Sequence, residues 1–222
     1  MSNGVILITG ATGGLGARTA HSFAERGDSL VLLDHNQDRL DALTRDLNLP
    51  ADRLIASVVD LRNGEAVRAA ADAVSAKFGA VRGLIHLVGG WVGGRTLTEA
   101  GPEELESMLG QHVWTTFHLF QSFTPLLVQS HAGRVIVVSA STVPNPPGKS
   151  GIYTAAKAAQ ENMVLTLAAE LKEQSVTANI IQVRAIDVDT GKGTTPNEIV
   201  AAMLYLFSEE AAKVSGARIP VY

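Results

Sequence analysis

Val5-Ile6-Leu7-Ile8-Thr9-Gly10-Ala11-Thr12-Gly13-Gly14-Leu15-Gly16 is the stretch that decides the fold. A strand-like apolar run leads into a glycine-rich turn, and a helix-like segment follows. Gly10 permits a tight turn, while Gly14 and Gly16 let the backbone approach a ligand closely. The N–H groups at the start of the helix then face an anion. The stretch predicts a dinucleotide cradle, with chance glycines in an ordinary strand–turn–helix as the alternative. The predicted cofactor-binding residues are Gly10, Thr12, Gly13, Gly14, Leu15 and Gly16.

The remainder of the chain alternates short apolar runs with segments of helical period. We predict strands at Val5–Thr9, Ser29–Asp34, Leu54–Asp60, Gly83–Val88, Arg134–Ser139, Thr177–Val183 and Ala217–Val221. We predict helices at Leu15–Arg26, Asp38–Leu47, Gly64–Phe78, Pro102–Ser130, Ile152–Gln174 and Pro196–Phe207. Several strand segments are nearly continuous Val, Ile and Leu, which is typical of strands buried on both faces of a parallel sheet. We therefore expect one α/β domain over residues 1–222, a Rossmann-type doubly wound parallel β-sheet with helices on both faces.

The composition excludes several classes of function. The 222 residues are 46% hydrophobic and 18% charged, which indicates a globular protein, and none of them is a cysteine. Disulfides, cysteine-based zinc sites and thiol nucleophiles are therefore excluded. A net charge of −4 without a Lys/Arg cluster argues against a nucleic-acid partner. The histidines show no ligand spacing with acidic residues, so we expect no metal site.

The sequence shows no sign of a membrane partner. No apolar run approaches the roughly 18 residues that a membrane-spanning helix needs. The N-terminus lacks a basic-then-apolar signal and leads directly into a strand. We therefore expect a cytoplasmic protein.

Asp34 ends the second predicted strand, where a carboxylate can accept hydrogen bonds from the adenosine ribose and repel a 2′-phosphate. Position 13 is glycine and not Arg or Lys, and Arg39 is expected on the next helix, away from a phosphate. These residues favour NAD(H) over NADP(H). The alternative role of Asp34 is to cap the following helix.

Tyr153 and Lys157 are four residues apart on a predicted helix and therefore share one face. The Lys157 cation is expected to stabilise the tyrosinate and to lower the pKa of Tyr153 from its usual value of about 10. A phenol tuned in this way can donate a proton to a carbonyl or imine as hydride arrives. A Tyr/Lys pair at this spacing is otherwise common on helix surfaces, but the preceding Pro/Gly-rich loop favours a catalytic role.

These features resemble the short-chain dehydrogenase/reductase family over essentially the whole chain. The resemblance is carried by the glycine turn, Asp34, Asp60, the Tyr/Lys pair and the ending Ser215–Val221. It implies that Asp60 and Leu61 contact the adenine, although Asp60 can equally serve as a helix-entry residue. The backbone at Val88, Gly89 and Gly90 is expected to pass close to the cofactor, and Lys157 to hold the nicotinamide ribose. The glycines also fit the longer epimerase-type relatives, but the chain is too short for their extra domain.

Several positions depart from the family pattern. The family's catalytic Ser, thirteen positions before the Tyr, is Ala140 here, and Ser139 and Ser141 flank it. Ser141 is our candidate for the missing hydroxyl because it lies nearer the strand end. His112 stands where the family has Asn, either as part of a proton relay or as a helix residue with a local hydrogen bond.

The departures are similar to those of the dihydropteridine reductase branch, in Leu87–Gly94 and in Trp114-Thr115-Thr116. That branch keeps the Tyr/Lys pair, lacks the Ser, uses NADH and reduces a quinonoid pterin. Trp91 is expected either to stack on a flat heterocycle or to be a packed aromatic, and Trp114 to be core or interface. The loop after Asp187 is shorter than in the family.

We therefore expect an NAD(H)-dependent oxidoreductase that reduces a carbonyl, quinonoid or imine-like small molecule. Its catalytic residues would be Tyr153, Lys157 and Ser141. The alternative is a non-catalytic NAD(H)-binding sensor or assembly protein on the same fold. By resemblance, the two long predicted helices are expected to pair across subunits in a homodimer or homotetramer.

Overall fold

A seven-stranded sheet forms the centre of the molecule, in a computed structural model that describes residues 4–188 and 191–222. The strand order is β3-β2-β1-β4-β5-β6-β7, and every pairing between neighbouring strands in the described residues is parallel. The strands are β1 (Val5–Thr9), β2 (Ser29–Asp34), β3 (Leu54–Val58), β4 (Gly83–His86), β5 (Arg134–Ala140), β6 (Thr177–Val183) and β7 (Arg218–Pro220). The predicted doubly wound parallel sheet is confirmed.

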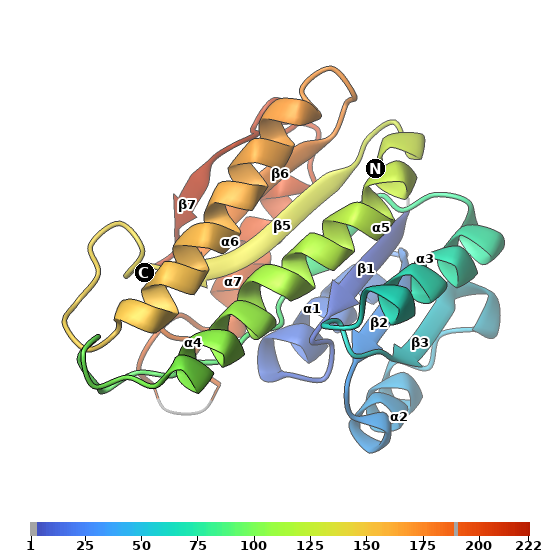
Figure 1. Ribbon diagram of the computed structural model, residues 1–222. Helices are drawn as coiled ribbons and strands as arrows, with labels where there is room; N and C mark the ends of the chain where they lie inside the picture. The colour runs from blue at the N-terminus through green and yellow to red at the C-terminus, as the bar shows by residue number, and fades with distance from the viewer. Residues whose placement is uncertain (1–3, 189–190) are drawn as a thin grey trace.

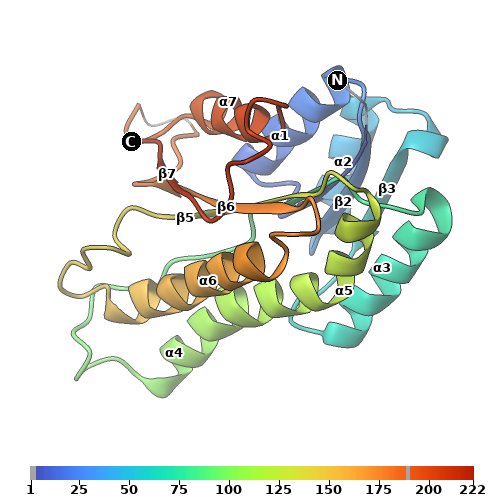
Figure 2. The ribbon, with the colours of Figure 1, turned by 90° about the horizontal axis from the view of Figure 1, so that it is seen from above.

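Helices cover both faces of the sheet (Figure 2). The helices α1 (Gly14–Glu25), α2 (Gln37–Leu47) and α7 (Pro196–Leu206) bury one apolar cluster against the sheet. The second cluster lies under α3 (Gly64–Phe78), α5 (Thr115–Gln129) and α6 (Gly151–Glu170). Alternate side chains of the strands enter each cluster, which explains why the strand sequences are apolar throughout. No helix of the described residues is long and apolar enough to cross a membrane.

The long helix predicted at Pro102–Ser130 is interrupted. It comprises α4 (Pro102–Met108), a π-helical segment at Leu109–Trp114 and α5. The hydroxyls of Thr115 and Thr116 donate to the carbonyls of Gln111 and His112, four residues earlier. Such local bonds compete with the regular backbone ladder, and π-helical segments often occur at functional sites. The segment places His112 inside the molecule, where its side chain is fully buried.

The order of the strands reverses between β1 and β4, which lie side by side at the middle of the sheet. The chain first runs outward from β1 to β3, and it then crosses to β4 and runs outward in the other direction. A crevice at the carboxyl ends of the strands is expected at such a switch point. Strands β3 and β4 end two residues before their predicted ends, because the chain leaves the sheet there to form the loops of this edge.

Candidate active site

The glycine turn has the predicted geometry of a phosphate cradle. Gly10 has a φ of +67°, and its amide donates to the Leu33 carbonyl of β2. A Cβ at Gly16 would overlap the carbonyl oxygens of Gly10 and Ala11, so only glycine allows α1 to pack this closely on the turn. Gly13 precedes α1 and provides no side-chain cap, which leaves the first amides of the helix available to an anion. The residues present therefore fit the pyrophosphate of a dinucleotide.

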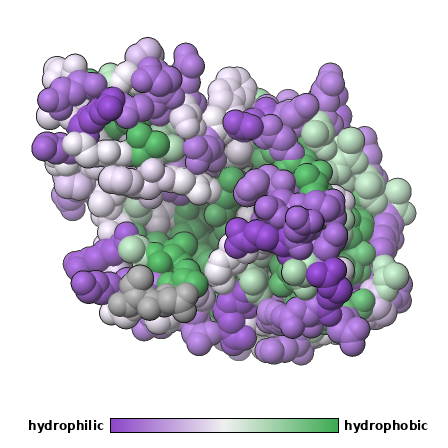
Figure 3. Space-filling view, turned by 90° about the horizontal axis from the view of Figure 1, so that it is seen from below, coloured by the Kyte–Doolittle hydropathy of each residue, from purple (hydrophilic) through white to green (hydrophobic). Residues whose placement is uncertain are grey.

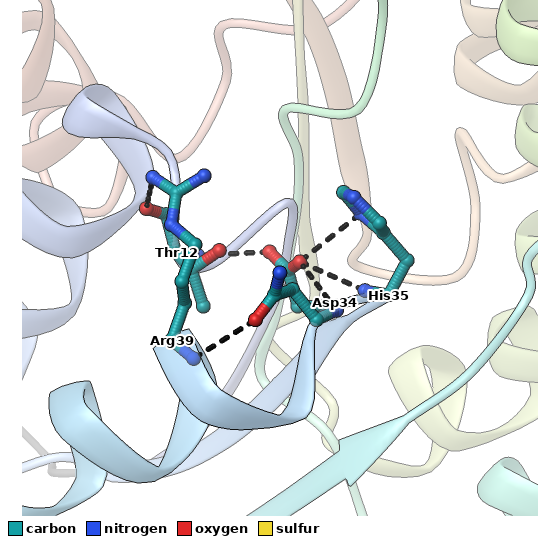
Figure 4. Close-up of polar contacts among 5 residues, drawn as sticks. Thr12, Asp34, His35 and Arg39 are labelled. Atoms are coloured by element: carbon teal, nitrogen blue, oxygen red, sulfur yellow. Dashed lines mark hydrogen bonds and ion pairs between the residues drawn. The ribbon is translucent and has the colours of Figure 1, made fainter.

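Asp34 lies beside this turn, at the end of β2 (Figure 4). Its carboxylate accepts hydrogen bonds from the amides of Thr12, His35 and Asn36. Burial opposes ionisation, but these bonds outweigh it and hold the pKa of Asp34 below its usual range. Asn36, and not Asp34, caps α2. The capping alternative for Asp34 is therefore wrong.

Arg39 lies on α2 as predicted, but it is not remote from the turn. Its Nη2 donates to the Thr12 carbonyl over 2.7 Å (Figure 4). A guanidinium is thus fixed at the glycine turn, on the residue whose amide donates to Asp34. Arg39 is thus on the next helix as expected, and the turn from β2 into α2 brings the start of that helix against Thr12.

Asp60 and Leu61 follow β3, farther out along the same edge. Asp60 is exposed and pairs with Arg62, with an Nη2–Oδ2 distance of 3.0 Å. The side chain of Leu61 is buried in the apolar cluster, and its carbonyl oxygen contacts His118 Nδ1. Neither residue lines the large cavity described below.

A cavity of about 800 Å³ runs along the carboxyl edge of the sheet. Figure 3 views the molecule from below and shows an apolar hollow bordered by more polar surface. The lining includes Gly10, Gly13, Gly14, Leu15 and Gly16 of the cradle, and Val88, Gly89 and Gly90 after β4. The opposite wall comes from the end of β5, the loop 147–150 and α6. The structure thus brings most of the predicted cofactor-binding residues to one cavity.

Tyr153 and Lys157 lie on this cavity, on the first turns of α6. Lys157 Nζ donates to the Val138 carbonyl and to Gln160 Oε1, each over 2.9 Å. Because an ammonium has three donors, one remains for a ribose hydroxyl or a substrate. Burial lowers the pKa of Lys157 to about 8, although the nearby charge of Glu161 opposes this shift.

The expected effect of Lys157 on Tyr153 is not seen. Burial raises the pKa of Tyr153 above its usual value. The ammonium is directed to Val138 and Gln160, and no hydrogen bond joins it to the phenol in the described residues. The predicted lowering of the tyrosine pKa is therefore wrong for the chain alone.

His112 is part of the site. Its Nε2 is 2.9 Å from the Gly90 carbonyl oxygen, and its ring lies edge-to-face with Tyr153 at a centroid distance of 5.7 Å. The local hydrogen bond that we considered is present, but the residue also lines the cavity. His86, the last residue of β4, is also buried, and its ring nitrogens are hydrogen-bonded to the hydroxyls of Thr9 and Thr115.

Gln160 is a site residue that the sequence did not reveal. Its Oε1 accepts from Lys157, and its Nε2 donates to Thr116 Oγ1 and to the His112 carbonyl. The amide therefore connects the catalytic helix to the π-helical segment. Its spacing in the sequence, one turn after Lys157 and on the same face of α6, is the signal that could have identified it as a site residue.

The hydroxyl groups near the end of β5 are not arranged as expected. Ser139 and Thr142 line the cavity, whereas Ser141 does not. The amide of Ser141 donates to the Val183 carbonyl, which continues the β5–β6 pairing. Successive residues of a strand point to opposite faces, so Ser139 and Ser141, two residues apart, share a face. The point at which the chain leaves β5 therefore decides which of the two side chains reaches the cavity.

The aromatic residues divide between the cavity and the surface. Trp91 lines the cavity and is 64% exposed, so it is not packed in the core. Trp114 is 54% exposed, which excludes the core position that we considered for it. No group of His, Asp and Glu residues in the described part of the chain could hold a metal ion.

A family model and two curated relatives match most of this chain. A family model described as short chain dehydrogenase matches residues 4–199. The 7alpha-hydroxysteroid dehydrogenase of Escherichia coli strain K12 is 26% identical over 97% of this chain and 91% of its own length. A 2,3-dihydroxy-2,3-dihydro-p-cumate dehydrogenase of Pseudomonas putida is 27% identical over 98% of this chain and 92% of its own length.

Solved structures share the fold. The L-sorbose reductase of Gluconobacter frateurii, solved with NADPH and L-sorbose, has a TM-score of 0.90 at 24% identity. The comparison covers 100% of this chain and 95% of the reductase chain. A second structure is an NADPH-bound short chain oxidoreductase of Pseudomonas aeruginosa with an atypical catalytic center. Its TM-score is also 0.90, at 24% identity, and the comparison covers 98% of this chain and 95% of that chain.

Proposed function

The chain belongs to the short-chain dehydrogenase family, and on that premise we propose that it reduces a carbonyl, quinonoid or imine-like small molecule with NAD(H). One observation carries the proposal. Tyr153 and Lys157 lie on the same cavity as the glycine cradle, so a dinucleotide in the cradle extends toward the phenol. Oxidoreductase chemistry follows from the family, whereas the acceptor and the cofactor preference are our inference.

A nicotinamide cofactor, when bound, supplies the hydride. Tyr153 donates its phenolic proton to the acceptor oxygen or nitrogen as the hydride reaches the adjacent carbon, and a proton from solvent restores the phenol. Lys157 stabilises the transient tyrosinate and holds the ribose with its remaining donor. We assign the hydroxyl that the family places on the acceptor to Ser139 or Thr142, because Ser141 lies outside the cavity.

The walls of the cavity favour a flat or small acceptor. Trp91 is on the rim, and Ile186 and Val188 follow β6 on the other side. An exposed indole at a cavity rim can stack on a conjugated ring. This arrangement supports an acceptor of the quinonoid or imine-like class, as the resemblance to dihydropteridine reductases implies.

A reductase assay tests the function. Purified protein with NADH would be supplied with quinonoid dihydropterins, quinones, diketones and aldehydes, and loss of the reduced nicotinamide absorbance would be followed. We expect turnover of at least one class that the Tyr153→Phe variant loses. Tight NADH binding without any turnover would support the sensor alternative, which the oxidoreductase relatives do not favour.

We propose NAD(H) as the preferred cofactor because the ionised carboxylate of Asp34 repels a 2′-phosphate. Arg39 is the opposing feature, since its guanidinium can attract that phosphate. Asp34→Asn keeps the shape of the side chain and removes its charge, so we expect the ratio of kcat/KM for NADH over NADPH to fall about tenfold or more, which corresponds to about 1.4 kcal/mol.

Initial rates with each cofactor measure this ratio, and Arg39→Ala is the matched variant. Arg39→Ala should raise the ratio, because the attraction for a 2′-phosphate is lost. A wild-type protein that prefers NADPH, and that loses this preference in Arg39→Ala, would reverse our assignment.

We also propose a homodimer or homotetramer that pairs through α4, α5 and α6. Leu105, Trp114 and Phe117 are 40%, 54% and 44% exposed, and the rings of Trp114 and Phe117 are 6.0 Å apart. Adjacent exposed aromatic side chains of this kind mark interaction surfaces. Light scattering after size-exclusion chromatography should give twice or four times 23.3 kDa.

The oligomer should depend on this surface. Phe117→Glu is expected to give a monomer, whereas Val58→Glu, at an exposed position of β3, leaves the mass unchanged. A wild-type species of 23.3 kDa would contradict the assignment.

A further inference from the structure

The Lys157 ammonium is held by acceptors from two different elements of the fold. One is the Val138 carbonyl of β5, and the other is Gln160 Oε1, one turn later on α6, each over 2.9 Å. A lysine side chain is long and flexible, so a single acceptor leaves its end free to pivot. Two acceptors fix the position of Nζ and leave one N–H for a ligand in the cavity.

The Gln160 amide is itself held in one orientation. It is fully buried, and its Nε2 donates to the His112 carbonyl over 3.2 Å and to Thr116 Oγ1 over 2.8 Å. Thr116 Oγ1 gives its own hydrogen to the same carbonyl, so it is an acceptor for the amide. A flipped amide would turn its NH₂ group toward the ammonium and its oxygen toward the His112 carbonyl, and both contacts would be repulsive. The chemistry of the partners therefore fixes the amide with its oxygen toward Nζ.

We propose that Gln160 is a positioning residue, which ties the Lys157 ammonium to the π-helical segment and so holds it at the cavity. The inference rests on the proposed function, in which Lys157 stabilises the tyrosinate and holds the ribose. Gln160 does not line the cavity, so it acts on the reaction only through Lys157. Without its oxygen the buried ammonium keeps a single protein acceptor, and its charged form becomes less favourable.

The ionisation of Lys157 is separated in pH from that of its titratable neighbours. Burial, above all, lowers the pKa of Lys157 to about 8, that of His112 to about 4 and that of His86 to about 3. Both histidine rings are therefore neutral above about pH 6. Burial raises the pKa of Tyr153 above its usual value of about 10. Between these limits Lys157 is the member of this cluster whose charge changes.

The other charges near Lys157 do not depend on Gln160. Glu161 is fully buried and pairs with Arg218, and its charge raises the pKa of Lys157. Two exposed cationic residues also line the cavity, Lys149 and Arg184. No hydrogen bond or ion pair in the described part of the chain joins any of these four residues to Gln160. A change of the Lys157 pKa in a Gln160 variant therefore reports the altered acceptor.

Lysine side-chain NMR measures this pKa directly, in protein without cofactor. The chain has six lysines, so labelling of lysine Cε with ¹³C gives few signals, and Lys157→Met identifies the signal of Lys157. Gln160→Met keeps the length of the side chain without the amide. It should lower the pKa of Lys157 by about one to two pH units, the equivalent of one hydrogen bond to a charged group. Gln160→Glu keeps an oxygen acceptor for Nζ, so the pKa should stay at the wild-type value or rise.

The pH profile of the reaction should follow the same order. The ammonium is present below its pKa and is lost as pH rises through it, so kcat/KM for reduction should decline there. The decline should move to lower pH in Gln160→Met and not in Gln160→Glu, whereas a purely structural residue would lower the rate at every pH.

Asn179→Leu is the matched control for the loss of a buried amide. Asn179 lies on β6 and does not line the cavity. Its Nδ2 donates to the Val214 carbonyl, and its Oδ1 accepts from the Ala217 amide. The control should lower the melting temperature and leave the pKa of Lys157 unchanged.

An unchanged pKa of Lys157 in Gln160→Met, or a lowered one in Gln160→Glu, overturns the proposal. If Gln160→Met does not fold, Thr116→Val gives the second test, because it removes one partner of Gln160 Nε2 and should lower the pKa by a smaller amount. No change in Thr116→Val then overturns the proposal. These outcomes are distinct from failure of the proposed function. A lowered pKa in Gln160→Met of a protein that reduces none of the acceptors would contradict the reductase and leave Gln160 as the residue that holds Lys157.

Discussion

Replacing Tyr153 with Phe should lower kcat by about 10²- to 10⁴-fold, the usual contribution of a positioned proton donor. Phe retains the ring and its edge-to-face contact with His112 but has no O–H. The phenol is the only tyrosine hydroxyl on the cavity lining of the described residues, so no other tyrosine can replace it. Because the change removes an interaction with the transition state, KM should change much less than kcat.

Steady-state kinetics and an NADH titration measure the two effects separately. Tyr205→Phe is the matched control, because Tyr205 is 51% exposed on α7 and does not line the cavity. We expect the control to keep wild-type kcat, and both variants to bind NADH as the wild type does. If Tyr153→Phe kept kcat within twofold of wild type, the phenol would not be the proton donor.

The raised pKa of Tyr153 fixes the sign of the pH dependence. Its phenol stays protonated up to a pH above its usual pKa of about 10, so the donor form is present throughout the neutral range. Reduction therefore does not require that the pH be lowered to protonate Tyr153. The reverse oxidation needs the tyrosinate, and its rate should rise with pH.

The fold was predictable because its signals are local. Apolar runs of strand length alternate with segments of helical period, and each predicted strand and helix is present within a few residues. The glycine turn is local too, since the contact between Gly16 and Gly10 spans a single turn of chain. The early ends of β3 and β4 were not predictable, because apolar residues continue into the loops that form the edge of the site.

The remainder of the site depends on packing between distant elements. Tyr153 and Lys157 were found from their spacing on one helix, but Gln160 acts through Thr116 and His112 on a different element. Whether Ser139, Ser141 or Thr142 reaches the cavity depends on where β5 leaves the sheet, which the strand sequence does not specify.

The predicted direction of the shift in the Tyr153 pKa was also wrong, because it too depends on packing between distant elements. The sequence places a cation one turn from the phenol, but burial of the phenol raises its pKa, and the Lys157 ammonium is directed to the Val138 carbonyl instead. Arg39 reaches Thr12 only because the chain turns sharply after β2. Electrostatic statements about pairs on one helix therefore need the neighbouring elements.

Replacing Lys157 with Met should lower kcat/KM by about 10²- to 10³-fold, as expected for loss of one preorganised charged donor. Met is of similar length and apolar, so it fits the buried position, but the Val138 carbonyl and Gln160 Oε1 lose their donor. The pKa of Lys157 is about 8, so in the wild type the ammonium is present below this pH and is lost as pH rises through it. The rate of reduction should therefore fall above about pH 8, and the Met variant should lack this decline.

The charge of Glu161 provides a sharper test of the same cation. Glu161 is fully buried, accepts from Gln182 Nε2 and pairs with Arg218 Nε over 2.6 Å, and its charge raises the pKa of Lys157. Glu161→Gln removes that charge, so the alkaline decline in rate should move to lower pH. Arg218→Gln leaves the carboxylate without its cation, so the decline should move to higher pH.

The two shifts have opposite signs, whereas a loss of stability would lower the rate of both variants at every pH. Profiles of kcat/KM against pH for the wild type and the two variants, with melting curves to show that each is folded, would decide whether the alkaline decline in rate comes from Lys157. Shifts in the same direction for both variants would assign the decline to another group.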